Sequence, residues 1–253
     1  MFNAFAASLR STCLSRQVGA AIADSKNELL SIGWNDVPAY GGGLATNHDK
    51  SCTALCRKKG MCRSTVEIND LIKNIHQTLV TQKFIQKGKD SSLLAKALKS
   101  AGIAELIEFS RAIHAEMEAI LSAARTAKPG LRDGTIYVTT YPCENCVKHI
   151  LASGLKRVVY IEPYPKSRAK AFFADFIQDE RTHDESQNKL QFSQFIGIAP
   201  LAYSLLYRKW FERKDAHGNY ITNEGDLTPV TSVYLDSYTL YEGRIADEVS
   251  RDK

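Results

Sequence analysis

Two short motifs restrict the fold of this chain of 253 residues more than any other feature of its sequence. The tripeptide H-A-E at residues 114–116 and the pentapeptide P-C-E-N-C at residues 142–146 each begin a predicted helix, just after a turn or a strand. The imidazole of His114 and the thiolates of Cys143 and Cys146 are zinc ligands, and three protein ligands leave the fourth tetrahedral position to water. The fold must therefore bring the starts of two helices together around one metal ion.

The residues around these ligands suit the same chemistry. Thiols at a helix N-terminus meet free backbone N–H groups and the positive end of the helix dipole, which favours the thiolate that zinc requires. Pro142 helps to set the helix entry, and Glu116 is close enough to His114 to exchange a proton with a water on the metal. The alternative is a helix-surface histidine beside a structural pair of cysteines. Spacing and context favour the metal site, and H-x-E with P-C-x-x-C is the signature of zinc-dependent deaminases.

The composition excludes several other classes of protein. At 44% hydrophobic and 24% charged residues, the chain is typical of a globular protein and unlike disordered, collagen or coiled-coil sequences. Its apolar runs fall short of the roughly 18 residues that span a bilayer, and the first residues lack the basic start of a secretory signal. We therefore expect a cytoplasmic protein that does not enter a membrane. The net charge of +5 suits anionic small molecules and nucleic acid alike.

Hydrophobic periodicity predicts alternating strands and helices along most of the chain. The predicted strands are residues 18–24, 28–34, 135–140, 157–162 and 190–196. The predicted helices are residues 1–13, 112–127, 144–153, 167–176 and 201–211, with a helical insertion at about 66–111. This order indicates an α/β fold, namely a three-layer α/β/α sandwich around a mixed sheet of about five strands.

With two more motifs near its N-terminus, the chain resembles the deoxycytidylate (dCMP) deaminase branch of the cytidine deaminase superfamily. Residues 11–20, S-T-C-L-S-R-Q-V-G-A, match the family opening S-x-C-x-R-x-V-G-A if one spacer is allowed. Residues 33–38, G-W-N-D-V-P, match the family pattern G-[YW]-N-x-x-P. The resemblance covers roughly residues 2–164 and implies a cytidine-deaminase-like fold. Free-nucleoside cytidine deaminases usually have cysteine at the position of His114 and resemble the chain less.

The C-terminal part carries a second, shorter resemblance. Residues 195–200, F-I-G-I-A-P, and residues 213–215, R-K-D, resemble the C-terminal part of bacterial antiphage dCTP deaminases. Those proteins commonly carry an N-terminal P-loop domain, and this sequence contains no G-x-x-x-x-G-K-[ST]. We therefore expect either a stand-alone deaminase or the catalytic half of a longer protein. We assign the deaminase domain to residues 1–211 and a C-terminal extension to residues 212–253.

Five residues are candidates for binding a deoxycytidine nucleotide. By the resemblance, Asn35 would bind the deoxyribose and Tyr164 would stack near the base; the alternatives are a turn asparagine and a half-buried aromatic side chain. For the phosphates we select Arg16, Lys166 and Arg168, because the mouth of the cleft should lie beyond the strand ends and a nucleotide needs positive charge there. The alternative for these three residues is a solvated surface position.

A second cluster of candidate metal ligands lies in a lysine-rich, loop-like stretch and comprises His48, Cys52, Cys56 and Cys62. In a reducing compartment such clusters indicate metal before disulfides, and a closed structural zinc would order this loop. Some dCMP deaminases hold a second zinc in the equivalent region, although the spacing here departs from their commonest pattern. The alternative is free cysteines. We thus expect one catalytic zinc ion and, at this cluster, a structural one.

Two further surfaces are candidates for partner binding. The helical insertion carries an apolar stripe of Leu71, Ile72, Ile75 and Leu79. Because deoxycytidylate deaminases are generally oligomers, the resemblance and this stripe together predict a homo-oligomer. A basic region around residues 57–59 is either a solvated face or a region that attracts a regulatory nucleotide or nucleic acid.

The leading hypothesis is zinc-dependent hydrolytic deamination of dCMP, dCTP or both to deoxyuridine nucleotides and ammonia, with antiphage nucleotide depletion as a role for the dCTP activity. One rival is a deaminase of cytosine or adenine within nucleic acid, which the modest charge and the lack of an aromatic stacking platform disfavour. The other is a catalytically silent deaminase-like binding module. The presence of Glu116 disfavours it, since a zinc scaffold alone would not require this carboxylate.

Overall fold

The computed structural model describes residues 1–47, 53–86, 91–126, 130–179 and 188–207, together with residues 214, 216–219 and 242. By its internal contacts the chain divides into two units, Met1–Ile196 and Gly197–Lys253. The first unit contains the sheet and the candidate catalytic residues. Within the second unit the structure describes helix α8, Pro200–Tyr207. The predicted domain boundary between residues 211 and 212 stays a prediction.

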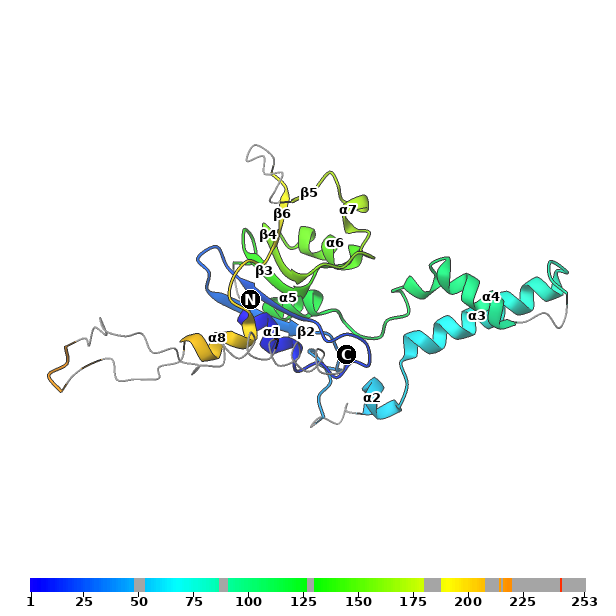
Figure 1. The fold of residues 1–253 in the computed structure, drawn as a ribbon, viewed down its shortest axis with the longest axis horizontal. Coiled ribbons are helices and arrows are strands. Elements are labelled where there is room, and N and C mark those ends of the chain that lie inside the picture. The colour runs from blue at the N-terminus through cyan, green and yellow to red at the C-terminus, as the bar shows by residue number, and fades with distance from the viewer. Residues whose placement is uncertain are drawn as a thin grey trace, which may run out of the picture. The chain divides into compact units, whose positions relative to one another are not determined.

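A six-stranded mixed sheet forms the centre of the first unit, with the strand order β2-β1-β3-β4-β6-β5 (Figure 1). The strands are β1 Gly19–Ala23, β2 Leu29–Trp34, β3 Thr135–Thr140, β4 Arg157–Glu162, β5 Ile177–Asp179 and β6 Leu190–Gln194. β1 is antiparallel to β2 and β3, whereas β3, β4, β6 and β5 run parallel to one another. The predicted mixed sheet is confirmed, and the structure adds the short edge strand β5.

The helices next to the sheet are α1 Phe2–Ser8, α5 Ala115–Arg125, α6 Glu144–Ala152 and α7 Ala169–Phe172. α7 is shorter than the helix predicted at residues 167–176. It ends at Phe172 because Phe173 packs against the core and Ile177 already pairs with Leu190 in the sheet. α5 begins three residues later than predicted because His114 has an extended backbone (φ −74°, ψ 153°).

The helical insertion begins earlier than predicted and contains α2 Cys56–Lys59, α3 Arg63–Thr81, α4 Ser91–Ser100 and the 3-10 helix η2 Ile103–Glu105. α3 and α4 pack against each other (Figure 1). In the apolar stripe of α3, Ile72 is buried and the other three residues are half-buried, so the chain itself covers part of the stripe. Across the described residues, every helix is too short or too polar to cross a lipid bilayer.

Two glycines set the layers of the fold by letting helices approach the sheet backbone closely. A Cβ atom on Gly19 would lie 2.0 Å from the Ala4 carbonyl oxygen of α1, and one on Gly33 would lie 2.3 Å from the Ala115 carbonyl oxygen of α5. Gly33 pairs with Ala20, the neighbour of Gly19, so the two glycines face opposite sides of the sheet. α1 and α5 therefore cover opposite faces, and the predicted α/β/α sandwich is confirmed.

The main core lies between the sheet and helices α5 and α6. One row of side chains crosses four strands in register: Ile22, Ile136, Val158 and Phe192. Each of these residues is at most 2% exposed. Because α5 precedes β3 and α6 follows it, the N-termini of both helices lie at the end of the sheet where β3 finishes. This core therefore fixes the two helix starts that carry the candidate metal ligands.

Candidate active site

The first helix start is held in place by a hydrogen-bonded loop. His114 is the N-cap of α5, and its carbonyl oxygen accepts the N–H of Glu118 at 3.0 Å. The preceding residue, Ile113, donates its N–H to the Asp36 carbonyl oxygen at 2.9 Å in an isolated β-bridge. The Asp36 carboxylate in turn accepts the backbone N–H and the hydroxyl of Thr12. These contacts fix the backbone that carries the His114 imidazole.

The second helix start has the form that its sequence predicts. Cys143 is the N-cap of α6, and its carbonyl oxygen accepts the N–H of Val147 at 3.0 Å. Cys143 is 8% exposed, and Cys146, in the first turn, is completely buried. The hydroxyl of Ser167 donates to the Pro142 carbonyl oxygen at 2.7 Å and ties the loop after β4 to this helix start. Both thiols thus lie beside free N–H groups of a helix N-terminus.

The three predicted metal ligands meet. The Nδ1 atom of His114 lies 3.5 Å from the Cys143 Sγ atom and 3.3 Å from the Cys146 Sγ atom. Zinc bonds of about 2.0 Å to nitrogen and about 2.3 Å to sulfur, at the tetrahedral angle, place such atoms about 3.6 Å apart. Among the described residues, these three form the one group whose donor atoms all lie within 4.8 Å of one another. The cluster therefore fits a zinc ion with an open fourth position.

Hydrogen bonds within the cluster shift the pKa values of its members. The bond from Cys146, followed by that from His114, lowers the pKa of Cys143 to about 4. The bond with Cys143 raises the pKa of His114 to about 9. The bond to Cys143 and burial both raise the pKa of Cys146. Zinc binds both cysteines as thiolates and histidine in its neutral form, so metal binding at this cluster would be accompanied by release of protons.

The predicted catalytic carboxylate lies inside this cluster. Glu116 is in the first turn of α5 and is 4% exposed. Burial raises its pKa, and the nearby His114 opposes the rise. The same side chain hydrogen-bonds with Cys146. A general acid–base residue must hold and release a proton beside the reacting atoms, and a carboxyl group whose pKa is raised by burial suits this role.

A cavity of about 640 Å³ adjoins the cluster. Cys143 lines it, together with three of the predicted substrate residues, Tyr164, Lys166 and Arg168. Tyr164 is partly buried and also packs on the core, while Lys166 and Arg168 are exposed at the cavity. The structure thus brings an aromatic side chain and two cations to the side of one metal ligand.

The other two predicted substrate residues are engaged elsewhere. The Asn35 Oδ1 atom accepts the N–H of Val18 at 2.7 Å, and its Nδ2 atom donates to the Arg16 carbonyl oxygen at 2.9 Å. Asn35 therefore orders the loop before β1, and one amide hydrogen remains for a further acceptor. The guanidinium of Arg16 forms an exposed ion pair with Glu162 at 3.2 Å and does not line the cavity.

The helical insertion supplies a wall of the cavity that no local sequence pattern predicted. Residues 101–103 and 105–108 line it opposite the loop after β4. The Glu105 carboxylate lies 3.3 Å from the Lys166 Nζ atom. On the other side, the Glu144 carboxylate accepts the backbone N–H of Arg168 at 3.1 Å. A carboxylate therefore lies beside the ammonium group of Lys166, whereas Glu144 contacts only the backbone of Arg168.

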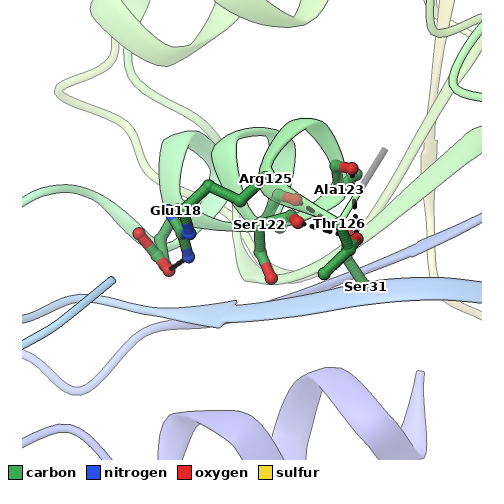
Figure 2. A network of polar contacts seen from close by, with 7 residues as sticks. Ser31, Glu118, Ser122, Ala123, Arg125 and Thr126 are labelled. Carbon is green, nitrogen blue, oxygen red and sulfur yellow. Dashed lines mark hydrogen bonds and ion pairs between the residues drawn. The ribbon is translucent and has the colours of Figure 1, made fainter. Parts of the chain in front are cut away.

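A polar network holds α5 against its neighbours (Figure 2). The Glu118 side chain is 5% exposed and forms an ion pair with Arg125 at 2.5 Å. Arg125 lies against the glycine-rich loop, where a Cβ atom on Gly42 would come within 3.0 Å of the arginine Cδ atom. The Ser31 hydroxyl of β2 donates to the Ala119 carbonyl oxygen at 2.7 Å. These contacts anchor the helix whose first turn carries Glu116.

The predicted second metal cluster lies partly within the described residues. His48 and Cys52 lie outside them, Cys56 begins α2 and Cys62 is the N-cap of α3. The structure adds Cys13 to their neighbourhood, because burial raises its pKa and the charges of Cys56 and Cys62 contribute to the rise. Ser15, close to Cys13 in the chain, hydrogen-bonds with Cys62. No local pattern predicts this neighbourhood, since Cys13 is isolated from the other cysteines in the chain.

Comparisons with known proteins show which proteins the chain is similar to. The family profile described as "Cytidine and deoxycytidylate deaminase zinc-binding region" matches residues 1–162. The deoxycytidylate deaminase of Enterobacteria phage T4 is 34% identical over 170 residues, or 65% of this chain and 77% of that protein. The phage T2 deoxycytidylate deaminase is 34% identical over 172 residues, or 65% of this chain and 79% of that protein. The crystal structure of the cyanophage S-TIM5 dCMP deaminase with dCMP and dUMP has 18% identity and a TM-score of 0.41, covering 76% of this chain and 90% of that one.

Zinc-dependent deaminases are the class of enzyme in which one histidine and two cysteines share a site with a glutamate that is not a ligand. The profile match includes all four of these residues and extends over more than half of the chain. The chain belongs to the cytidine and deoxycytidylate deaminase family. The predicted family is thereby confirmed. The three predicted ligands lie together in the structure, and their binding of zinc stays a prediction.

Proposed function

We propose that the protein hydrolyses the exocyclic amino group of deoxycytidine nucleotides, with dCMP as its first substrate, to give deoxyuridine nucleotides and ammonia. One observation carries this proposal: the buried Glu116 carboxyl group lies within a His/Cys/Cys cluster whose Cys143 lines a cavity with Lys166 and Arg168. The deoxycytidylate deaminases of phages T4 and T2, at 34% identity, support dCMP as the substrate.

His114, Cys143 and Cys146 would hold the zinc ion, because their donor atoms have the separations that tetrahedral ligation requires. Bound zinc supplies Lewis acidity, which makes water a nucleophile near neutral pH. Glu116 would accept one proton from the attacking water and pass it to the ring nitrogen beside the amino-bearing carbon. It would then move the second proton of the added oxygen to the amino group, which leaves as ammonia. The raised pKa of Glu116 keeps its protonated form accessible during these transfers.

The rest of the nucleotide would be bound from the loop after β4 and from the start of α7. Tyr164 offers an aromatic face for the base, and Lys166 and Arg168 offer charge for the phosphate. Asn35 keeps one amide hydrogen for the deoxyribose. Arg16 is the weakest of the predicted phosphate ligands, because it is paired with Glu162 outside the cavity.

dCTP is the second candidate substrate of the same site. Lys148 lines the cavity in addition to Lys166 and Arg168, and three cations suit a triphosphate better than a monophosphate. The resemblance of the C-terminal part to antiphage dCTP deaminases points the same way. Depletion of dCTP during phage infection would be the corresponding role.

A structural zinc ion and a homo-oligomer complete the proposal. Cys56 and Cys62 would hold the second zinc together with His48 and Cys52. The stripe on α3 is half-buried in its own chain, so an oligomer would use only its remaining exposed part. Light scattering of the purified protein at micromolar concentration tests the oligomer, and a monomer would contradict it.

The substrate is tested by release of ammonia from dCMP, dCTP, deoxycytidine and a cytosine-containing single-stranded DNA, each at the same cytosine concentration. We expect turnover of dCMP or dCTP to exceed that of deoxycytidine by at least tenfold in kcat/KM, because deoxycytidine lacks a group for the two cations. Turnover of the DNA alone would contradict the proposal and favour the nucleic-acid deaminase. No turnover with any of them would favour the silent binding module.

A further inference from the structure

The 3-10 helix at the end of the insertion places an acidic side chain where a substrate phosphate is expected. Glu105, the last residue of η2, lies 3.3 Å from the ammonium group of Lys166, and both side chains line the cavity that reaches Cys143. The two residues are far apart in the chain, and the insertion has no other ion pair with the loop after β4 within the described residues. The contact therefore joins the insertion to the substrate side of the cavity.

This ion pair is of the kind that a ligand can displace. The Lys166 and Glu105 side chains are 62% and 48% exposed, and exposed ion pairs contribute little net free energy. A nucleotide phosphate has more negative charge than a carboxylate and three acceptor oxygens, so it competes well for the same ammonium group. A nucleoside has no group with which to compete.

The wall around Glu105 allows the exchange without a large movement. Leu106 and Ile107, the next two residues, are half-buried and line the same cavity. Release of Lys166 then requires only a rotation of the Glu105 side chain, which is free to turn because it is exposed. The carboxylate would remain near the phosphate and repel it.

We propose that Glu105 is a specificity-determining residue that occupies Lys166 in the free enzyme and must be displaced by the substrate phosphate. This inference rests on the proposed function, because it assigns Lys166 to the phosphate. Glu105 then weakens the binding of nucleotides and leaves that of nucleosides unchanged. It leaves the chemical step at Glu116 unaffected.

The test is Glu105→Gln, assayed with dCMP and with deoxycytidine at low ionic strength. We expect the KM for dCMP to fall about two- to fivefold with kcat unchanged, and the KM for deoxycytidine to stay constant. The effect should fade at high salt because the pair is exposed. An unchanged or higher KM for dCMP would overturn the proposal, and the latter would mean that Glu105 holds Lys166 in its productive position.

Three further variants separate this effect from a general change of charge. Glu67→Gln removes an acidic residue that pairs with Arg63 on α3, away from the cavity, and should leave both KM values unchanged. Glu108→Gln removes a charge from the cavity wall without touching the pair; an equal fall in KM there would overturn a specific role of Glu105. In a Lys166→Met background, Glu105→Gln should lose its effect, and a persisting effect would also overturn the proposal.

Binding measurements keep the inference separate from the proposed function. Calorimetric titration of the Glu116→Gln protein with dCMP, with and without Glu105→Gln, should show a two- to fivefold tighter dissociation constant for the double variant. If the native protein deaminates no nucleotide but this difference is found, the proposed reaction fails and the competition at Lys166 stands. If dCMP is deaminated but the difference is missing, the reaction stands and the role of Glu105 is refuted.

Discussion

The guanidinium group of Arg168 is the cation whose role can be tested with the fewest side effects. It is exposed at the cavity, and its side chain forms no ion pair within the described part of the chain. We expect Arg168→Glu to raise the KM for dCMP about tenfold, since a charge-assisted hydrogen bond to phosphate is lost. The rise should be larger for dCTP, which has more charge to repel.

The control for this variant is Lys170→Glu, two residues along the chain. Lys170 pairs with Asp179 at 2.5 Å and does not line the cavity, so its reversal should leave the KM values unchanged. Steady-state kinetics with dCMP, dCTP and deoxycytidine provides the measurement. Equal losses with deoxycytidine, which has no phosphate, would show that Arg168 shapes the fold and does not bind the nucleotide.

For single residues, the sequence predicted the members of the site whose positions depend on their immediate neighbours in the chain. His114, Glu116, Cys143 and Cys146 could be identified because each motif sets its own helix start, and the two starts meet in the structure. Glu105 could not, because its contact with Lys166 depends on how the insertion returns to the sheet. Cys13 was missed for the same reason.

Within helix α5, the buried Glu118 carboxylate is paired with Arg125 (Figure 2). We expect Arg125→Met to lower the free energy of unfolding by about 2–3 kcal/mol, because it leaves the buried Glu118 carboxylate without its partner. Chemical denaturation measures the loss. The matched control is Lys73→Met, which removes the exposed ion pair with Asp70 on α3 and should cost less than about 1 kcal/mol. Similar losses in the two variants would contradict the importance of burial at Glu118.

At the scale of elements, periodicity predicted the long strands and helices but not the edge of the sheet. β5 is three residues long, and its pairing with β6 is set by tertiary contacts that leave no pattern in the sequence. The same contacts shorten α7. The close approach of α5 to the sheet at Gly33 was likewise hidden, because a glycine in a strand does not reveal which backbone lies beside it.

For the molecule as a whole, the number of bound zinc ions tests whether both cysteine clusters are metal sites. We expect two zinc ions per chain in the native protein and one in Cys62→Ala, with a lower melting temperature and most of the deaminase activity retained. Cys143→Ala should also contain one zinc ion but have no activity, because it removes a ligand of the catalytic metal. Elemental analysis of the purified proteins distinguishes these cases. One zinc ion in the native protein, with Cys13, Cys56 and Cys62 freely reactive toward thiol reagents, would contradict the second site.

The most direct test of the proposed reaction compares ammonia release from dCMP by the native protein and by Glu116→Gln, with zinc content and thermal unfolding measured on the same samples. Glutamine keeps the shape of the side chain but cannot accept a proton, so kcat should fall by at least about a thousandfold. Zinc content and melting temperature should change little, because Glu116 is not a metal ligand. Native turnover in the Glu116→Gln protein would contradict the proposed role of Glu116. The absence of both dCMP and dCTP deamination in the native protein with its zinc bound would contradict the proposed function.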